Sequence, residues 1–154
     1  LYDVRGLFSD PPLFSMERAA TPLLGAPQYG VHVNGYVDRG GEIFMWVARR
    51  ALSKATYPGK LDHLAAGGIS AGCGVWETLL KECREEACVP ESLAATARPC
   101  GTVSLMQVRD AVATEEFKPN CALVVLDFLL RRGHIQPDTE KFYTKFVELL
   151  HSPL

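Results

Sequence analysis

The feature that most constrains this chain is the glycine-rich run Gly67–Gly74, which leads directly into a stretch of helical character. Glycine lets a backbone turn tightly and lets other groups approach it closely. From Val75 to Ala87 the apolar residues recur at helical spacing, which predicts a helix with one face toward a core. The loop amides would then lie at the start of a helix, an arrangement that can approach phosphate.

The predicted helix carries three carboxylates, Glu82, Glu85 and Glu86, at positions i, i+3 and i+4. At about 100° per residue they fall on one face and repel one another. Magnesium resolves such repulsion, because it takes oxygen ligands and keeps open positions for phosphate. The pattern therefore indicates metal-assisted chemistry on a phosphorylated substrate. The alternative is a solvated helix face on which Lys81 and Arg84 pair with these carboxylates.

The spacing resembles the Nudix box, a glycine-to-glutamate pattern that binds metal. Gly67 fits its first glycine, and Val89 fits its last aliphatic position. The resemblance implies that Glu82, Glu85 and Glu86 are both the metal ligands and the catalytic residues. The implied cofactor is magnesium, with manganese as a possible substitute.

The chain departs from the Nudix box at three positions. Cys73 replaces an upstream glutamate, Lys81 replaces an arginine, and Cys88 replaces a late glycine. In Nudix proteins the glutamate and the arginine mainly hold the loop and the helix together. Both members of that pair are replaced here, whereas all three metal-binding glutamates are kept.

The flanking segments are similar to the Nudix branch related to thiamine pyrophosphokinase, over most of residues 7–150. They are LFSMERAATPLLG, YGVHVNGYVD, LDHLAAGGISAG, ETLLKECREEA and EEFKPNCALVVLDFLLRRG. The resemblance implies an α+β fold, a Nudix-type α/β/α sandwich with a mixed sheet, plus C-terminal helices. It also implies a diphosphatase acting on a damaged thiamine diphosphate or on an oxidised guanine nucleoside diphosphate.

A strand expected at Cys100–Ser104 runs straight into a helix expected at Leu105–Ala113, where this branch continues through further strands. We interpret this junction as a skipped piece of the sheet, which leaves the fold incomplete. The alternative function is then a truncated, non-catalytic Nudix-like binding or interaction protein. The chain starts at Leu1 rather than Met, which indicates a fragment or a processed product. Because the resembled branch has an additional N-terminal region, we interpret residues 1–27 as its tail and residues 28–154 as the Nudix domain.

Alternation and turn residues predict the remaining elements. Residues 1–27 are expected to be irregular, with one helical turn near Met16–Ala20. The predicted strands are Gly30–Asp38 and Ile43–Arg49, paired as a hairpin, and Leu61–Ala66. The other predicted helices are Pro90–Ala97, Pro119–Arg132 with Gly133 as its cap, and a final helix from Pro137.

Five residues are candidates for binding the substrate. Gly67 and Gly68 can offer backbone amides, whereas His32, Asn34 and Tyr36 alternate along the first predicted strand and so share one face. Such a face can contact the ring of a substrate. Ordinary strand polarity is the alternative.

Composition limits the partners. A formal net charge of -2 at pH 7 gives no case for a nucleic-acid polymer, and no apolar run approaches the roughly 18 residues of a membrane span. The expected partner is a small-molecule diphosphate. The five cysteines form no C-x-x-C pair, and His63, His134 and His151 have no ligand-like spacing. This pattern predicts buried free thiols in a reducing compartment, the cytoplasm.

Overall fold

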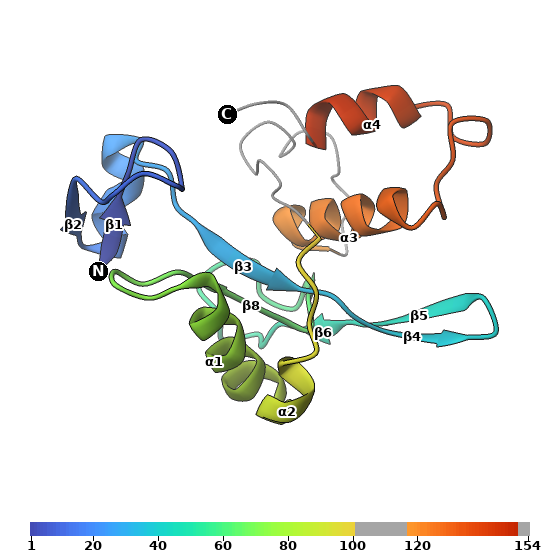
Figure 1. Cartoon of the computed structure of the whole chain (residues 1–154), viewed down its shortest axis with the longest axis horizontal. Helices are drawn as coiled ribbons and strands as arrows, with labels where there is room; N and C mark the ends of the chain where they lie inside the picture. The colour runs from blue at the N-terminus through green and yellow to red at the C-terminus, as the bar shows by residue number, and fades with distance from the viewer. Residues whose placement is uncertain (101–116, 151–154) are drawn as a thin grey trace. The chain divides into compact units, whose positions relative to one another are not determined.

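The computed structural model describes residues 1–100 and 117–150 (Figure 1). It divides into two compact units, one made of Leu1–Val33 with Ala65–Ala97 and the other of Asn34–Leu64 with Arg98–Leu154. Within the described ranges, no helix combines the length and the apolar character that crossing a membrane requires.

The first unit begins with a hairpin, in which β1 (Tyr2–Val4) pairs antiparallel with β2 (Phe14–Met16). The prediction of an irregular lead-in was therefore wrong for these residues. The two strands are close in sequence, and a hydrogen bond that Asp3 accepts from Ser15 Oγ at 2.7 Å links their side chains. The helical turn expected near Met16–Ala20 occurs slightly later, as the 3₁₀ helix η1 (Arg18–Leu24).

The centre of this unit is a second antiparallel pair, β3 (Gly30–Val33) with β8 (Ala65–Gly68). The helix α1 (Val75–Ala87) packs against both strands, and the short α2 (Glu91–Ala94) packs against α1. The core consists of Ala65, Cys83 and Ala94, with Val33, Leu79, Leu80 and Val89 around them. The predicted helix Val75–Ala87 is confirmed at both ends.

One apolar residue on the core-facing side of α1 lies outside the core. This residue is Trp76, which is 42% exposed. It lies seven residues before Cys83 and so on the same helix face, about 10 Å along the axis. The stripe thus extends one turn beyond Leu79, the first of the residues that pack into the core.

The second unit contains the predicted hairpin. Here β4 (Gly35–Arg39) pairs with β5 (Glu42–Trp46) through Gly40 and Gly41, whose φ angles are 67° and 94°. Two consecutive positive φ angles suit a two-residue hairpin turn, which explains the glycine pair. The expected single strand Gly30–Asp38 was wrong, because the chain breaks at Asn34 and β3 and β4 pair with different partners.

The expected strand Leu61–Ala66 is likewise divided. Leu61–Asp62 forms β7, which pairs with β6 (Ala48–Arg49), and Ala65–Gly68 forms β8. Arg50 donates to Asp62 across this pair at 2.6 Å, so an ion pair holds β7 in place where only two residues pair. Periodicity alone does not reveal such a switch of partners.

Two helices complete the second unit, α3 (Pro119–Arg131) and α4 (Tyr143–Leu150). The helix predicted from Pro119 is confirmed, and Gly133 follows it with a φ of 73°. The last helix begins later than the predicted Pro137, because Glu140 accepts a hydrogen bond from the amide of Phe142 in a local turn. The core here is made of Leu123, Leu130 and Leu150, with Leu126, Ile135, Tyr143, Phe146 and Val147 around them.

The described strands form four two-stranded antiparallel sheets, and one parallel bridge joins Leu61 to Phe117. The α+β class is confirmed, whereas the sandwich with one mixed sheet stays a prediction. The predicted helix Leu105–Ala113 and all of the predicted strand Cys100–Ser104 except its first residue lie outside the described residues.

Candidate functional site

The glutamates of α1 lie where this helix meets β8. The Glu82 side chain is 13% exposed, and a Cβ added to Gly67 would come within 2.1 Å of its Cδ. Glu86 Oε2 accepts a hydrogen bond from the amide of Ala66 at 3.2 Å. Two of the three glutamates are therefore held against the backbone of β8.

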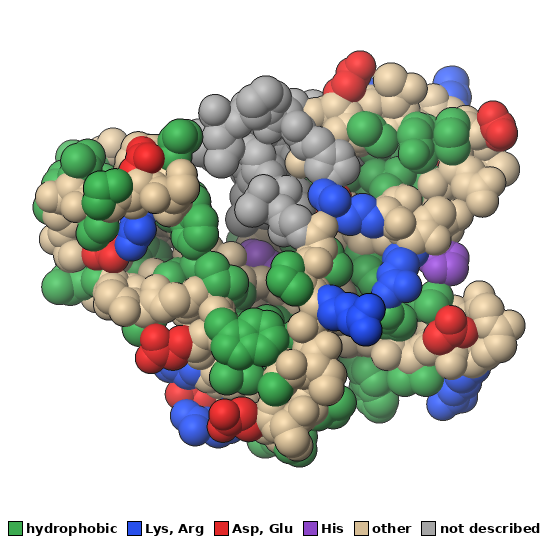
Figure 2. Space-filling model, viewed as in Figure 1, with side chains coloured by type: hydrophobic (Ala, Val, Ile, Leu, Met, Phe, Trp, Pro, Cys, Tyr) green, Lys and Arg blue, Asp and Glu red, His purple; other side chains and the backbone are tan. Residues whose placement is uncertain are grey.

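Lys81 neutralises this group of acids. Its Nζ lies 3.0 Å from Glu82 Oε1 and 3.1 Å from Glu85 Oε2. These hydrogen bonds, first that to Glu82 and then that to Glu85, raise the pKa of Lys81. Figure 2 shows acidic and basic side chains side by side over α1. The pairing of Lys81 with Glu85 is the i, i+4 contact that the alternative interpretation predicted.

The two candidate glycines lie in a strand rather than in a loop. Gly67 pairs with Val31 and Gly68 pairs with Gly30, so the glycine loop begins only at residue 69. A Cβ on Gly68 would come within 1.5 Å of the hydroxyl oxygen of Tyr2. Glu82 and Tyr2 thus fill the space beside these glycines. That Gly67 and Gly68 contact the substrate stays a prediction.

His32 lies in β3 opposite Ala66, whereas Asn34 and Tyr36 belong to the second unit. Asn34 Nδ2 donates to the carbonyl of Val124 in α3 at 3.3 Å. Asn34 therefore contacts α3, and a substrate-binding function of His32, Asn34 and Tyr36 is still a prediction.

Tyr36 takes part in an aromatic and cationic cluster on the second unit. Its ring lies 5.1 Å from that of Phe128, and the Arg132 guanidinium lies 4.9 Å above it. Arg132 also donates a hydrogen bond to the Tyr36 hydroxyl. These contacts attach β4 to α3, so Tyr36 has a packing role whatever else it does.

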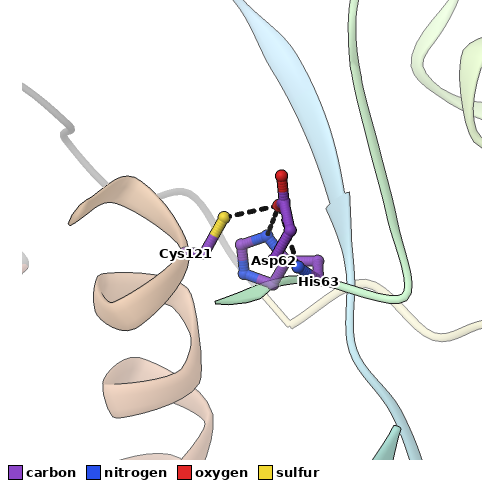
Figure 3. A group of neighbouring side chains, drawn as sticks. All are labelled: Asp62, His63 and Cys121. Atoms are coloured by element: carbon purple, nitrogen blue, oxygen red, sulfur yellow. Dashed lines mark hydrogen bonds and ion pairs between the residues drawn. The ribbon is translucent and has the colours of Figure 1, made fainter. Parts of the chain in front are cut away.

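A different group brings metal-ligating atoms together most closely (Figure 3). Asp62 and His63 follow one another at the end of β7, and Cys121 lies in the first turn of α3. One ligand atom from each lies within 4.8 Å of the others, and among residues 1–100 and 117–150 this is the one such group. The three glutamates of α1 do not converge to that degree.

Hydrogen bonds define this group. Cys121 Sγ donates to Asp62 Oδ1 at 2.7 Å, and the amide of His63 donates to the same oxygen at 2.9 Å. Asp62 Oδ2 accepts from Arg50 Nη1 at 2.6 Å and from Lys118 Nζ at 3.4 Å. One carboxylate oxygen thus faces the thiol and the other faces two cations.

These contacts shift two pKa values in opposite directions. Burial alone would raise the pKa of Asp62, but hydrogen bonds from Cys121 and Arg50 and the charge of Lys118 lower it to about 2. Burial and then the hydrogen bond to Asp62 raise the pKa of Cys121 to about 12. The thiol is therefore protonated and is a donor at neutral pH. Sequence spacing gave no signal for this group, since Cys121 is 59 residues from Asp62.

No family model matches the chain. Nudix hydrolase 24, chloroplastic, of Arabidopsis thaliana is 39% identical over 181 residues, which cover 90% of this chain and 50% of the relative. Nudix hydrolase 20, chloroplastic, of the same plant is 36% identical over 191 residues, covering 97% and 51%. The chain is homologous to Nudix hydrolases.

A third relative extends this similarity to fungi. An uncharacterised protein of Saccharomyces cerevisiae is 31% identical over 198 residues, which cover 93% of this chain and 58% of that protein. The chain thus spans about half the length of the relatives it matches. The comparisons thus support the predicted resemblance to Nudix hydrolases.

The comparisons correct one prediction. The chain was expected to be cytoplasmic, but the two Arabidopsis Nudix hydrolases carry the description chloroplastic. The expectation failed because unpaired cysteines indicate a reducing environment and do not distinguish one reducing compartment from another.

Proposed function

We propose that this chain hydrolyses a diphosphate bond in a small organic diphosphate, with magnesium or manganese held by Glu82, Glu85 and Glu86. The observation that carries the proposal is the contact between Gly67 and Glu82. These are the glycine and the first metal glutamate of the Nudix pattern, brought together in a chain whose relatives are named Nudix hydrolases.

The residues fit such an ion. Carboxylate oxygens are the ligands that magnesium prefers, and it needs only one or two of them because substrate phosphate and water complete the shell. Glu82 and Glu86 are oriented by β8, and Glu85 is half-exposed beside them. When bound, the ion supplies charge neutralisation at the diphosphate and a water of lowered pKa.

The residues of the chain have separate tasks in this proposal. Gly67 leaves the space in which the Glu82 carboxylate is held, and the Ala66 amide orients Glu86. Lys81 pairs with Glu82 and Glu85 before an ion binds and so offsets part of their charge, and it must release them when an ion binds. Holding these groups ready lowers the reorganisation that the reaction requires.

Similarity of the flanking segments supports a substrate class. The segments around the box resemble the branch related to thiamine pyrophosphokinase, so the proposed substrates are damaged thiamine diphosphates or oxidised guanine nucleoside diphosphates. The same resemblance supports a Nudix domain over residues 28–154, with residues 1–27 as the tail of a preceding region.

One observation favours a second candidate, a truncated Nudix-like protein that does not turn over substrate. The alignments with the relatives extend over 181, 191 and 198 residues, although this chain has only 154. Each relative thus has residues inside the aligned region that have no counterpart here. We propose that this difference lies at the junction of Ser104 and Leu105.

Phosphate release by the purified chain tests the proposal. The substrates are oxothiamine diphosphate and a panel of nucleoside diphosphates, each with magnesium and with chelator. Glu86→Gln is expected to abolish release, whereas the control Glu77→Gln, an exposed glutamate in the first turn of α1, is expected to retain it. Chain that is folded by circular dichroism but releases no phosphate would establish the non-catalytic alternative.

A further inference from the structure

We propose that Asp62, His63 and Cys121 form a second metal site, for zinc or a similar borderline-soft divalent ion. The site goes beyond the proposed hydrolysis and does not depend on it, because it uses a thiol and an imidazole instead of the carboxylates of α1. Zinc favours this set of sulfur, nitrogen and oxygen donors, whereas magnesium does not.

The two distances to Asp62 Oδ1 require only small movements. Around a tetrahedral zinc ion, sulfur, nitrogen and oxygen ligands lie roughly 3.3–3.7 Å from one another. His63 Nδ1 already lies 3.7 Å from Asp62 Oδ1. Cys121 Sγ lies 2.7 Å from the same oxygen, so the thiol and the carboxylate must separate by about 1 Å.

Burial favours a bound ion over a loose association. Cys121 is 0% exposed and the His63 side chain is also 0% exposed, while the Asp62 side chain is 13% exposed. Two ligands are thus shielded from water, and the carboxylate is the one ligand that is partly exposed. Three protein ligands with a water is a known arrangement of zinc sites.

The outer contacts of Asp62 orient it toward the other two ligands. Arg50 and Lys118 bind Oδ2, so that Oδ1 is left facing Cys121 and His63. Partners that hold the far oxygen of a carboxylate ligand are a regular part of metal sites. Their positive charges also repel an ion, so the site is expected to bind more weakly than a four-ligand structural zinc site.

Binding has a definite proton balance. In the ion-free form the Cys121 S–H donates to Asp62 Oδ1. On binding, the thiol proton leaves to solvent, a zinc–sulfur bond forms, and the S–H···O hydrogen bond is replaced by coordination of that oxygen. One proton is released for each ion bound, and no redox partner is needed.

The competing explanation is that the thiol and the carboxylate only tie β7 to α3. Cobalt(II), which replaces zinc and gives a thiolate-to-cobalt absorption band, distinguishes the two. Titration of the full chain with cobalt is expected to give this band with one ion per chain, and zinc is expected to displace it. Absence of the band from chain that is folded by circular dichroism would overturn the proposal.

Variants locate the site. Cys121→Ser is expected to remove the band, and His63→Gln is expected to lower cobalt affinity at least about tenfold. Cys88→Ser, which changes an exposed cysteine, is expected to leave the band intact. A band that persists in Cys121→Ser, or that is lost in Cys88→Ser, would overturn the proposal.

Two further variants keep the test decisive if Cys121→Ser does not fold. Lys118→Gln removes one repelling charge, while the shorter contact from Arg50 at 2.6 Å still orients Asp62, and it is expected to tighten cobalt binding at least about threefold. Unchanged or weaker binding would contradict the site. Glu86→Gln is expected to abolish hydrolysis while leaving the band unchanged, so that failure here and failure of the proposed hydrolysis are distinguishable.

Discussion

The carboxylate of Glu82 occupies the space that a side chain at Gly67 would need, because a Cβ added at Gly67 would lie only 2.1 Å from the Glu82 Cδ. Gly67 and Glu82, the glycine and the first glutamate of the Nudix pattern, thus lie in direct contact. A β-carbon at residue 67 would have to displace the first of the proposed metal ligands.

Gly67→Ala is therefore expected to reduce the proposed hydrolysis strongly at little cost in stability, because the Glu82 carboxylate is the far end of a flexible side chain that can move away. Phosphate release and urea unfolding measure the two effects. The control is Gly74→Ser, because nothing lies within 4 Å of a Cβ added at Gly74 and serine suits the start of a helix. Equal losses in both variants would contradict the contact.

Cys88→Gly is expected to stabilise the chain. Cys88 ends α1 with a φ of 52°, in the left-handed region, at the position where the Nudix box has glycine. Relief of that strain, less the added freedom of the unfolded chain, is worth about 0.5–1 kcal/mol. This corresponds to a rise in Tm of about 1–4 °C.

Thermal unfolding followed by circular dichroism measures this change. Cys88→Ala is the matched control, since it removes the thiol but keeps the β-carbon and hence the strain. A gain in Tm for the alanine variant as large as that for glycine would show that the thiol, not the backbone, is responsible.

Lys81→Met is expected to lower the magnesium concentration needed for half-maximal phosphate release. Lys81 occupies the carboxylates of Glu82 and Glu85 in the ion-free chain, so an ion must compete with it. Removing the competitor should tighten magnesium binding several-fold, on the order of one partly screened charge contact. Without magnesium the same variant should lose stability, because the carboxylates then repel one another.

Arg84→Met is the control for this measurement, since Arg84 is the other basic residue in the same part of α1. The two variants change the net charge equally. A similar shift in both would mean that general electrostatics, and not the specific contacts of Lys81, governs metal affinity.

Acid is expected to weaken the second unit through Asp62. Its folded-state pKa of about 2 lies below the ordinary value of 3.8, so the ionised form stabilises the folded chain. That contribution is complete above about pH 4 and is lost as the pH falls to about 2. Its size is about 2 kcal/mol.

Urea unfolding between pH 5 and pH 2 measures this loss, with Asp62→Asn as the comparison. The variant is expected to be less stable at pH 5 and to show a shallower decline over the same interval. An identical decline in both chains would assign the acid sensitivity to other carboxylates.

Local elements were predictable where one segment carries its own signal. The helix Val75–Ala87 has an apolar stripe, the helix from Pro119 has proline at its start and a positive-φ glycine after its end, and the hairpin turn has two glycines. These signals depend on residues close in sequence, because helix periodicity, caps and turns are local properties.

Strand partners were not predictable to the same degree. Periodicity ran through Asn34 and through residues 61–66, yet in both places the chain changes partner. Pairing depends on segments far apart in the chain, and alternation along one strand does not say which other strand it meets.

By itself, the sequence determined that a glycine is followed by a helix with three glutamates on one face. Residues at a fixed spacing on one helix have fixed positions relative to one another. The sequence also determined the similarity to Nudix hydrolases. Only the tertiary structure decided that Gly67 makes room for Glu82, and that Cys121 meets Asp62 from 59 residues away. Such contacts arise when separate elements pack, and no local spacing records them.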